Sequence, residues 1–514
     1  MERIAILLND RSYEYDIYTL VIAFFQGVRT QVSDPGSLSP DGADLVIEAW
    51  VLPEHLSLSI RSSSSRMIPV PPGADRSVVK NLIKRNLYEM LRELTGRDLP
   101  WGNLTGIRPV KLAMQLVEEQ ESEISRRLPE QASDSGLRLP EQENGSSPGM
   151  RGIVPDARRR MQERYYVSPG KADLAVRIAE RERRILRGID TKNGYSLYIG
   201  IPFCPSICLY CSFSSSPTSL WKTRVDEYLD ALIWEMRSCR DFFHGKILHT
   251  VYIGGGTPVT LEAEQLERLL GAVEENFDLS RLMEYTVEAG RPDSITRQKL
   301  EVIRKHPVTR ISVNPQTMNQ KTLDLIGRRH TVEDTVRAFD MARELGFDNI
   351  NMDLIVGLPG EGLEEVEYTM QRIEALNPDD VTVHALALKR AARLALHMDE
   401  YEKISFHASD RIMERCEEGC ERLGMTPYYL YRQKNMAGNF ENVGYARPGK
   451  AGIYNILIME EVECILALGA SGSTKIVYED GRIERIENVK DIRNYLERID
   501  EMIDRKMKEV PGNG

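Results

Sequence analysis

The feature that most constrains the fold is an alternation of short β-rich runs with amphipathic helical stretches between residues 195 and 390. Alternating strand and helix patterns are typical of βα units, whose strands pair in parallel. Both a βα barrel and a doubly wound sheet fit this rhythm. The six β-rich runs are SLYIGIP from Ser196, TVYIGG from Thr250, YTVEA from Tyr285, RISVNP from Arg310, INMDLIV from Ile350 and DVTVHAL from Asp380.

The rest of the chain divides into segments of different character, because 514 residues are too many for one hydrophobic core. Residues 1–117 predict a small α/β domain. Residues 118–165, rich in Pro, Ser, Glu, Gln and Arg, predict a low-complexity linker or insertion. We expect a connecting helix in residues 166–194, the βα core in residues 195–395, and a C-terminal domain in residues 396–514.

The C-terminal segment has a mixed α and β pattern. Strands are predicted around residues 428–431 and 453–459, and a hairpin is predicted to turn at Asp480-Gly481. We expect this domain to cover the open end of the βα core.

Composition and charge restrict the partners and the location. The chain has 67 basic and 78 acidic residues, a formal charge of −11, so its surface as a whole would repel a phosphate backbone. Nucleic acid is therefore not an expected partner. No stretch approaches the roughly 18 apolar residues of a membrane span, and the N-terminus lacks the pattern of a secretory signal. These features predict a cytoplasmic protein without a membrane segment.

Three cysteines lie close together in IPFCPSICLYCSF, directly after the first β-rich run. Three thiolates on one loop can hold three irons of a [4Fe–4S] cluster, whereas a closed electron-transfer cluster needs a fourth cysteine. The remaining iron can then bind a small molecule. Zinc is the alternative, but structural zinc needs four ligands, and neither a second cysteine pair nor a nearby His completes the set. The candidate ligands are Cys204, Cys208 and Cys211.

Two further features stand where strands of the core are predicted to end. The run Gly254-Gly255-Gly256-Thr257-Pro258 ends the second strand, and glycines there would let a ligand approach the backbone. It is neither a Walker loop nor GxGxxG, so by itself it also fits a tight turn. Glu288 closes the third strand, at the end where βα enzymes place their active sites, although a helix N-cap contact is the alternative.

The cysteine loop and the motifs after it resemble a known family. YIGIPFCPSICLYCSF is similar to the signature of radical S-adenosylmethionine (SAM) enzymes, and its surroundings resemble the oxygen-independent coproporphyrinogen III oxidase family, in particular its HemZ-type members. The resemblance runs from about Tyr195 to Gly472, with GGGTP, VEAGRPD, NPQTM, IGRRHT and DLIVGLPGE in the family's order. It implies an α/β fold: an incomplete (β/α)6 TIM-like radical-SAM barrel with an N-terminal α/β domain and a mixed α+β C-terminal domain.

The resemblance also implies roles for individual residues. Tyr198, Gly255 and Glu288 match positions that contact the cluster-bound SAM, and Tyr198 and Glu288 are the candidate catalytic residues. The implied cofactors are a [4Fe–4S] cluster with three cysteine ligands and an open iron, together with one or two molecules of SAM. The positions that match those used for a second SAM are Tyr210, Gly256, Thr257, Gln316, Arg328, Asp353 and Ala387.

The family's reaction is oxidative. A 5′-deoxyadenosyl radical made from SAM takes a hydrogen from the β-carbon of a coproporphyrinogen III propionate, and loss of CO2 and an electron leaves a vinyl group. The resemblance thus implies a radical SAM oxidoreductase of haem and porphyrin biosynthesis that makes protoporphyrinogen IX, with a tetrapyrrole substrate and an electron donor such as flavodoxin or ferredoxin. The substrate's carboxylates would favour Arg or Lys anchors. The candidates are Lys389, Arg390, Arg432, Lys434, Arg447 and Lys450.

Two other functions stay open because the chain departs from the oxidase pattern. Phe213 stands where that pattern has a further cysteine, and Gly200 stands where it has a His. A haem-binding or haem-delivery protein would share the same core, and Tyr454 lies near the place of a C-terminal His motif of the related haem chaperones. Tyrosine can ligate haem iron. The other alternative is a radical SAM enzyme that modifies another tetrapyrrole.

The N-terminal 190 residues show no resemblance to the oxidase. Within them, PWGNLTGIRPVKL at residues 100–112 is basic and contains glycine, which suggests a surface specific to a subfamily.

Overall fold

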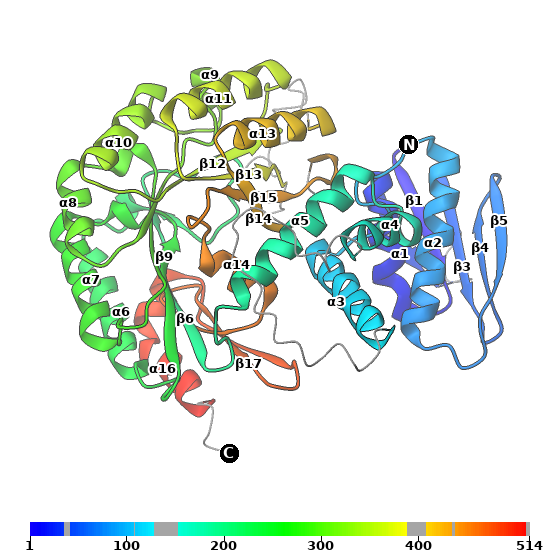
Figure 1. The fold of residues 1–514 in the computed structure, drawn as a ribbon, viewed down its shortest axis with the longest axis horizontal. Helices are drawn as coiled ribbons and strands as arrows, with labels where there is room; N and C mark the ends of the chain where they lie inside the picture. Colours follow the sequence, from blue (N-terminus) through cyan, green and yellow to red (C-terminus); the bar gives the residue numbers. More distant parts are fainter. Residues whose placement is uncertain (35–41, 107, 128–152, 388–407, 434–436, 510–514) are drawn as a thin grey trace. The chain divides into compact units, whose positions relative to one another are not determined.

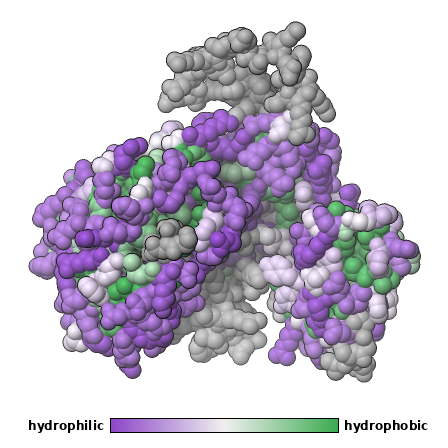
Figure 2. All heavy atoms as spheres, turned by 90° about the horizontal axis from the view of Figure 1, so that it is seen from below, coloured by the Kyte–Doolittle hydropathy of each residue, from purple (hydrophilic) through white to green (hydrophobic). Residues whose placement is uncertain are grey.

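The computed structural model describes residues 1–34, 42–106, 108–127, 153–387, 408–433 and 437–509. The chain divides into two compact units, one of residues 1–179 with 432–435 and the other of residues 180–431 with 436–514. The boundary falls within helix α5 (Pro169–Leu186). Among the described helices, none is both long enough and apolar enough to cross a membrane. Hydrophilic residues cover most of the described surface that Figure 2 shows, as expected for a chain with 28% charged residues.

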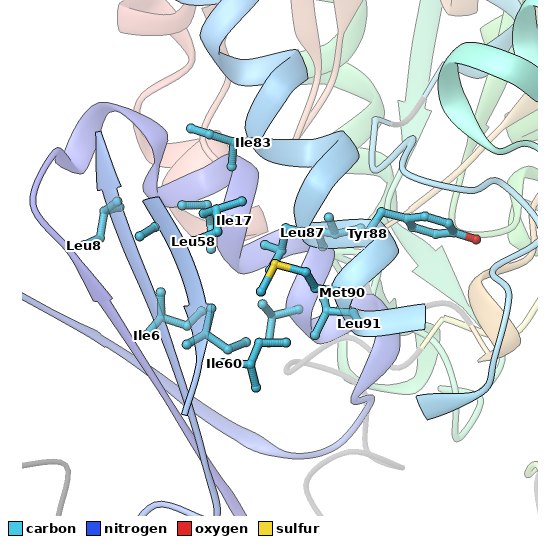
Figure 3. Close-up of a cluster of buried hydrophobic side chains, with 14 of the residues drawn as sticks. Ile6, Leu8, Ile17, Leu58, Ile60, Ile83, Leu87, Tyr88, Met90 and Leu91 are labelled. Carbon is cyan, nitrogen blue, oxygen red and sulfur yellow. The ribbon is translucent and has the colours of Figure 1, made fainter. Parts of the chain in front are cut away.

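The first unit is built on a five-stranded sheet with the order β2-β1-β3-β4-β5. Strand β1 is parallel to β2 and β3, and the other pairs are antiparallel. Apolar side chains from the sheet and from helices α1 and α2 form one buried core, part of which Figure 3 shows. This is the α/β fold expected for the N-terminal residues. The elements are β1 (Arg3–Leu8), α1 (Glu14–Phe24), β2 (Arg29–Ser33), β3 (Leu45–Val51), β4 (His55–Ile60), β5 (Ser64–Pro69) and α2 (Arg76–Thr95).

The segment predicted as a linker, residues 118–165, is helical at both ends. Helix α3 (Pro109–Arg127) continues into it, and helix α4 (Ile153–Tyr165) occupies its last part. Ala157 and Met161 of α4 are fully buried, so α4 belongs to the core of the first unit. For these described parts the linker prediction was wrong, because a charge-rich helix needs only a few apolar residues on one face to pack.

The second unit is built on an eleven-stranded sheet, in which six strands lie parallel and side by side in chain order. They are β6 (Gly194–Ile201), β9 (Ile247–Gly255), β10 (Glu284–Gly290), β11 (Arg310–Val313), β12 (Ile350–Val356) and β13 (Asp380–Ala385), and they correspond to the six predicted runs. Helices α6 (Val225–Cys239), α7 (Ala263–Asn276), α8 (Arg297–Lys305), α10 (Val332–Glu344) and α11 (Leu363–Leu376) lie along the outer side of the curved sheet (Figure 1).

The sheet continues at both edges with strands from the C-terminal part of the chain. At one edge β16 (Cys464–Leu468) pairs in parallel with β6, and the hairpin of β17 (Ser473–Val477) and β18 (Ile483–Glu487) follows. At the other edge β15 (Asn442–Ala446) and β14 (Thr426–Tyr431) add antiparallel strands to β13. The sheet therefore ends at β14 and β18 without closing, which confirms the incomplete barrel and rules out the doubly wound order.

This arrangement changes the picture of the C-terminal residues. They are mixed α and β, as predicted, but their described strands extend the sheet of the core instead of forming a sheet of their own. The predicted strand at residues 453–459 was wrong, because Ile453–Glu460 forms helix α14. Its buried residues are spaced as on one face of a helix: Tyr454 and Leu457 are three residues apart, and Ile456 and Glu460 are four apart. A short apolar run does not distinguish a strand from a buried helix by pattern alone.

The helices of the C-terminal part of the chain pack on the helices that lie along the sheet. Helix α13 (Asp410–Arg422) packs on α11, and α15 (Ile492–Glu497) and α16 (Ile499–Lys508) pack on α6. Lys506 of α16 and Glu235 of α6 form an ion pair of 2.8 Å in which neither side chain is exposed. Glu235 also accepts hydrogen bonds from the backbone N of Gly469, after β16, and from the Tyr495 hydroxyl. The pair thus links the C-terminal helix to the loop that ends β16.

Candidate functional site

The three cysteines lie on the loop that follows β6, at the C-terminal end of the parallel strands. Cys204 ends the short strand β7 (Phe203–Cys204), and the backbone N of Cys211 donates to the carbonyl of Cys208 at 3.1 Å. All three thiols are free; Cys208 is buried, and the other two are partly exposed. Burial raises the pKa of the Cys204 and Cys211 thiols. These thiols are therefore neutral at neutral pH, and metal binding would release their protons.

The surroundings of the loop fit an anionic cluster. Within the described residues, no three His, Cys, Asp or Glu side chains gather closely enough to hold a single metal ion. A [4Fe–4S] cluster is larger, and its thiolates bind separate irons. Two buried guanidinium groups face the loop: Arg291 Nη1 lies 3.6 Å from the Cys208 sulfur, and Arg328 Nη2 donates to the Tyr210 hydroxyl at 3.3 Å. Positive groups beside a ligand thiolate stabilise its charged form.

Backbone hydrogen bonds join the glycine motif to the residues just before the cysteine loop. The backbone N of Gly256 donates to the carbonyl of Ile201 at 2.7 Å, and that of Thr257 donates to the carbonyl of Phe203 at 2.7 Å. The Thr257 hydroxyl lies 3.6 Å from the Cys204 sulfur. A Cβ atom on Gly256 would lie 2.5 Å from the Phe203 carbonyl oxygen. At Gly256 the missing side chain therefore makes room for the backbone of Phe203, whereas the sequence predicted that a ligand would approach these glycines.

Glu288 projects from β10 beside the glycine motif. Its carboxylate accepts a hydrogen bond from the Tyr252 hydroxyl of the neighbouring strand β9. A Cβ atom on Gly254 would lie 3.1 Å from the Glu288 carboxyl carbon, so the missing side chain at Gly254 makes room for the acid. Burial raises the pKa of Glu288 to about 7; the bond from Tyr252 opposes this shift. Glu288 therefore changes charge near neutral pH.

Three tyrosine rings stack next to this acid. Tyr198 of β6 and Tyr252 of β9 have ring centroids 6.3 Å apart, and Tyr454 of α14 lies 4.5 Å from Tyr252. Only Tyr198 was predicted as a site residue. Tyr252 lies in a predicted strand, but the sequence does not show that it pairs with Tyr198, because that pairing depends on the order of the strands in the sheet. Tyr454 was singled out as a haem ligand, whereas the structure buries its ring among the other two.

The residues matched to a second SAM form separate contacts. Tyr210 and Arg328 meet at the cysteine loop, and the backbone N of Gln316 donates to the carbonyl of Asp353 at 3.0 Å. Gln316 has a positive φ of 70°, which is uncommon for a residue with a side chain and is found at many functional sites. Ala387 lies just after β13. Asn314 links the two groups, because its carbonyl accepts a hydrogen bond from Arg328 Nη1 and its side-chain oxygen accepts one from the backbone N of Asp353 at 3.3 Å.

His384 was not predicted, but it lies beside Asp353. The His384 Nε2 atom is 3.8 Å from the Asp353 carboxylate. Burial alone would raise the pKa of Asp353, but His384, the hydrogen bond from Asn351 and the charge of Arg310 together outweigh it, so the pKa is lowered. Asp353 is therefore ionised at neutral pH.

Two of the basic residues proposed as substrate anchors lie away from this site. Arg447 lies 3.7 Å from Asp379, and Lys450 lies 3.2 Å from Asp348; both acids precede strands, at the opposite end of the sheet. These two assignments were wrong, because β15 runs antiparallel to β13 and carries its C-terminal end away from the cysteine loop. Arg432 belongs to the first unit, where its guanidinium lies 5.8 Å from the Trp101 ring centre. Lys389, Arg390 and Lys434 lie outside the described residues.

Comparisons with known proteins identify relatives of this chain. The profile of the radical SAM superfamily matches residues 198–373. The oxygen-independent coproporphyrinogen-III oxidase-like protein HemZ of Bacillus subtilis is 37% identical over 435 residues, 84% of this chain and 81% of that protein. The heme chaperone HemW of Lactococcus lactis is 33% identical over 279 residues, 54% of this chain and 69% of that protein. The solved structure of the Escherichia coli coproporphyrinogen III oxidase HemN is 25% identical, with a TM-score of 0.49, over 62% of this chain and 73% of that one.

Membership of the superfamily implies a [4Fe–4S] cluster and SAM as cofactors. The match to HemZ extends well beyond the barrel, over more than four fifths of both proteins. The chain therefore belongs to the radical SAM superfamily and, within it, to the family of oxygen-independent coproporphyrinogen III oxidase-like proteins that includes HemZ.

Proposed function

We propose that this protein is a radical SAM oxidoreductase that decarboxylates propionate side chains of coproporphyrinogen III to vinyl groups, giving protoporphyrinogen IX. The observation that carries the proposal is the 37% identity to the oxidase-like HemZ over 84% of the chain. In this role Cys204, Cys208 and Cys211 are the cluster ligands, and Glu288 and Tyr198 contact SAM. The bound cluster and SAM would supply a carbon-centred radical able to take a hydrogen atom.

The chain's own residues support this chemistry in three ways. The cysteine loop lies at the C-terminal ends of the parallel strands, where βα enzymes bind substrates. Glu288 has a pKa of about 7, and its ionised carboxylate would bind the positively charged amino group of SAM. The stacked rings of Tyr198, Tyr252 and Tyr454 lie beside Glu288 and would limit the access of water to a radical formed there.

The direct test follows the tetrapyrrole by mass spectrometry. The protein is reconstituted anaerobically with iron and sulfide and then incubated with SAM, a reductant and coproporphyrinogen III. We expect a product lighter by two CO2 and four hydrogen atoms, since each vinyl group forms by loss of one CO2 and two hydrogens. Formation of 5′-deoxyadenosine with an unchanged tetrapyrrole would reject coproporphyrinogen III as the substrate and retain the radical chemistry. Haem would then be the next compound to test.

The titration of Glu288 predicts how SAM binding depends on pH. Between about pH 5 and 7 the affinity for SAM should rise by up to about tenfold per pH unit, because only the ionised carboxylate attracts the amino group. Above pH 7 the rise should level off, and Glu288→Gln should show weak binding with no such rise. Anaerobic equilibrium dialysis of the cluster-loaded protein measures both profiles.

Tyr252→Phe supplies a matched control for this prediction. The lost hydroxyl normally lowers the pKa of Glu288, so the midpoint of the binding profile should move to higher pH in this variant. Identical profiles for the wild type and Glu288→Gln would show that another group controls SAM binding.

The second candidate is a haem-binding protein, which the 33% identity to the heme chaperone HemW favours. Tyr454 is a poor haem ligand in this fold, because it is 5% exposed and stacked on Tyr252. The backbone N of Ile453 bonds to Glu284, the first residue of β10, so α14 starts at the end of the sheet opposite the cysteine loop. A haem titration of the wild type and Tyr454→Phe tests this candidate. A specific Soret shift that Tyr454→Phe abolishes would support haem ligation by this residue.

A further inference from the structure

Arg291 connects the end of β10 to the cysteine loop through hydrogen bonds from all three nitrogens of its guanidinium group. Its Nε and Nη2 atoms donate to the two carboxylate oxygens of Asp293, at 2.9 and 2.7 Å. Its Nη1 atom donates to the carbonyl and the hydroxyl of Ser206, at 3.0 and 2.9 Å, and faces the Cys208 sulfur at 3.6 Å. The residue is 3% exposed. A buried guanidinium that uses both edges of its fork has one orientation, and here that orientation points at Cys208.

The hydrogen bonds of Arg291 orient its guanidinium group toward the cysteine loop. The fork with Asp293 fixes the plane of the guanidinium, and the paired carboxylate offsets the cost of burying the charge. The third nitrogen is then left to hold the loop backbone at Ser206 and to approach the sulfur. The sequence offers no sign of this contact, because residues 208 and 291 are 83 positions apart.

A second guanidinium strengthens the positive field at the same sulfur. Arg328 is 6% exposed and contacts the Tyr210 hydroxyl and the carbonyl of Asn314. Among the described residues, no carboxylate forms an ion pair with it. His330 has its pKa lowered to about 4 by burial and by the charges of Arg328 and Arg291, so it stays neutral. The charges nearest Cys208 are therefore positive, and only that of Arg291 is paired.

We propose that Arg291 is a positioning residue of the cluster site, which fixes the loop at Ser206 and raises the reduction potential of the cluster through its hydrogen bond to the Cys208 sulfur. Hydrogen bonds and positive charge at cluster sulfurs favour the reduced state, which carries one more negative charge. This inference rests on the cluster assignment of the proposed function and is independent of which tetrapyrrole is the substrate.

The test measures the potential of the reconstituted cluster by a redox titration followed by electron paramagnetic resonance. Arg291→Lys keeps the positive charge but loses the fork, and Arg291→Gln loses the charge. We expect a lower potential in both, with the larger shift in Arg291→Gln; a tenfold loss in the relative stability of the reduced state corresponds to about 59 mV for one electron. Arg297→Gln on the exposed face of α8 is the control and should keep the wild-type potential.

One further measurement separates the ways in which this inference can fail. Hydrogen exchange of the metal-free protein reports on positioning alone, and amides 206–211 should exchange faster in Arg291→Gln than in the wild type or Arg297→Gln. Full iron content with an unchanged potential and unchanged exchange in both Arg291 variants would overturn the proposal. A wild-type protein that binds no [4Fe–4S] cluster would instead overturn the cluster assignment itself.

Discussion

Cys208→Ala should remove the cluster and with it every reaction that depends on SAM cleavage. The remaining two cysteines leave a second iron without a protein ligand, and the buried positive groups at residue 208 lose the thiolate that they face. We expect iron and sulfide near background after reconstitution and a fall in 5′-deoxyadenosine formation of at least roughly 10³-fold, about 4 kcal/mol in activation free energy. Metal analysis and single-turnover assays measure the two effects.

Cys416→Ala is the matched control for this substitution. Cys416 is also buried, but it lies on α13, away from the cysteine loop. The control should bind a full cluster and cleave SAM at the wild-type rate. If Cys208→Ala bound as much iron as Cys416→Ala, the loop would not be the cluster site.

Lys506→Met should be among the most destabilising single substitutions in the second unit. It leaves the fully buried carboxylate of Glu235 without its cation, and removal of one partner of a buried ion pair typically costs about 3–5 kcal/mol. Lys506 also donates to Asn488 at 2.6 Å, so a second buried group loses its partner. Chemical unfolding followed by circular dichroism measures the loss.

The same helix offers the control for this prediction. Lys508→Met on the exposed end of α16 should change the free energy of unfolding by no more than about 0.5 kcal/mol. Combining Lys506→Met with Glu235→Gln should recover part of the stability, because the remaining side chain is no longer charged. Equal stability of the Lys506 and Lys508 variants would show that the buried pair contributes nothing.

The second unit shows how far sequence patterns reach. The six parallel strands and the cysteine motif were predictable, because strand periodicity and C-x3-C-x2-C spacing are local properties of the chain. Helix α14 was mistaken for a strand because its eight residues are too few for a periodicity that separates the two. The helical ends of the predicted linker were missed because their apolar faces are narrow.

The sequence by itself determined the chemistry that the loop can support and the order of the barrel strands. Only the tertiary structure decided which side chains meet that loop. Arg291 reaches Cys208, and Tyr454 stacks on Tyr252, across separations that no periodicity spans. Strand direction alone places Arg447 at the wrong end of the sheet for a substrate anchor. Such contacts depend on sheet order, register and strand direction, which arise from packing between distant segments and leave no local pattern in the chain.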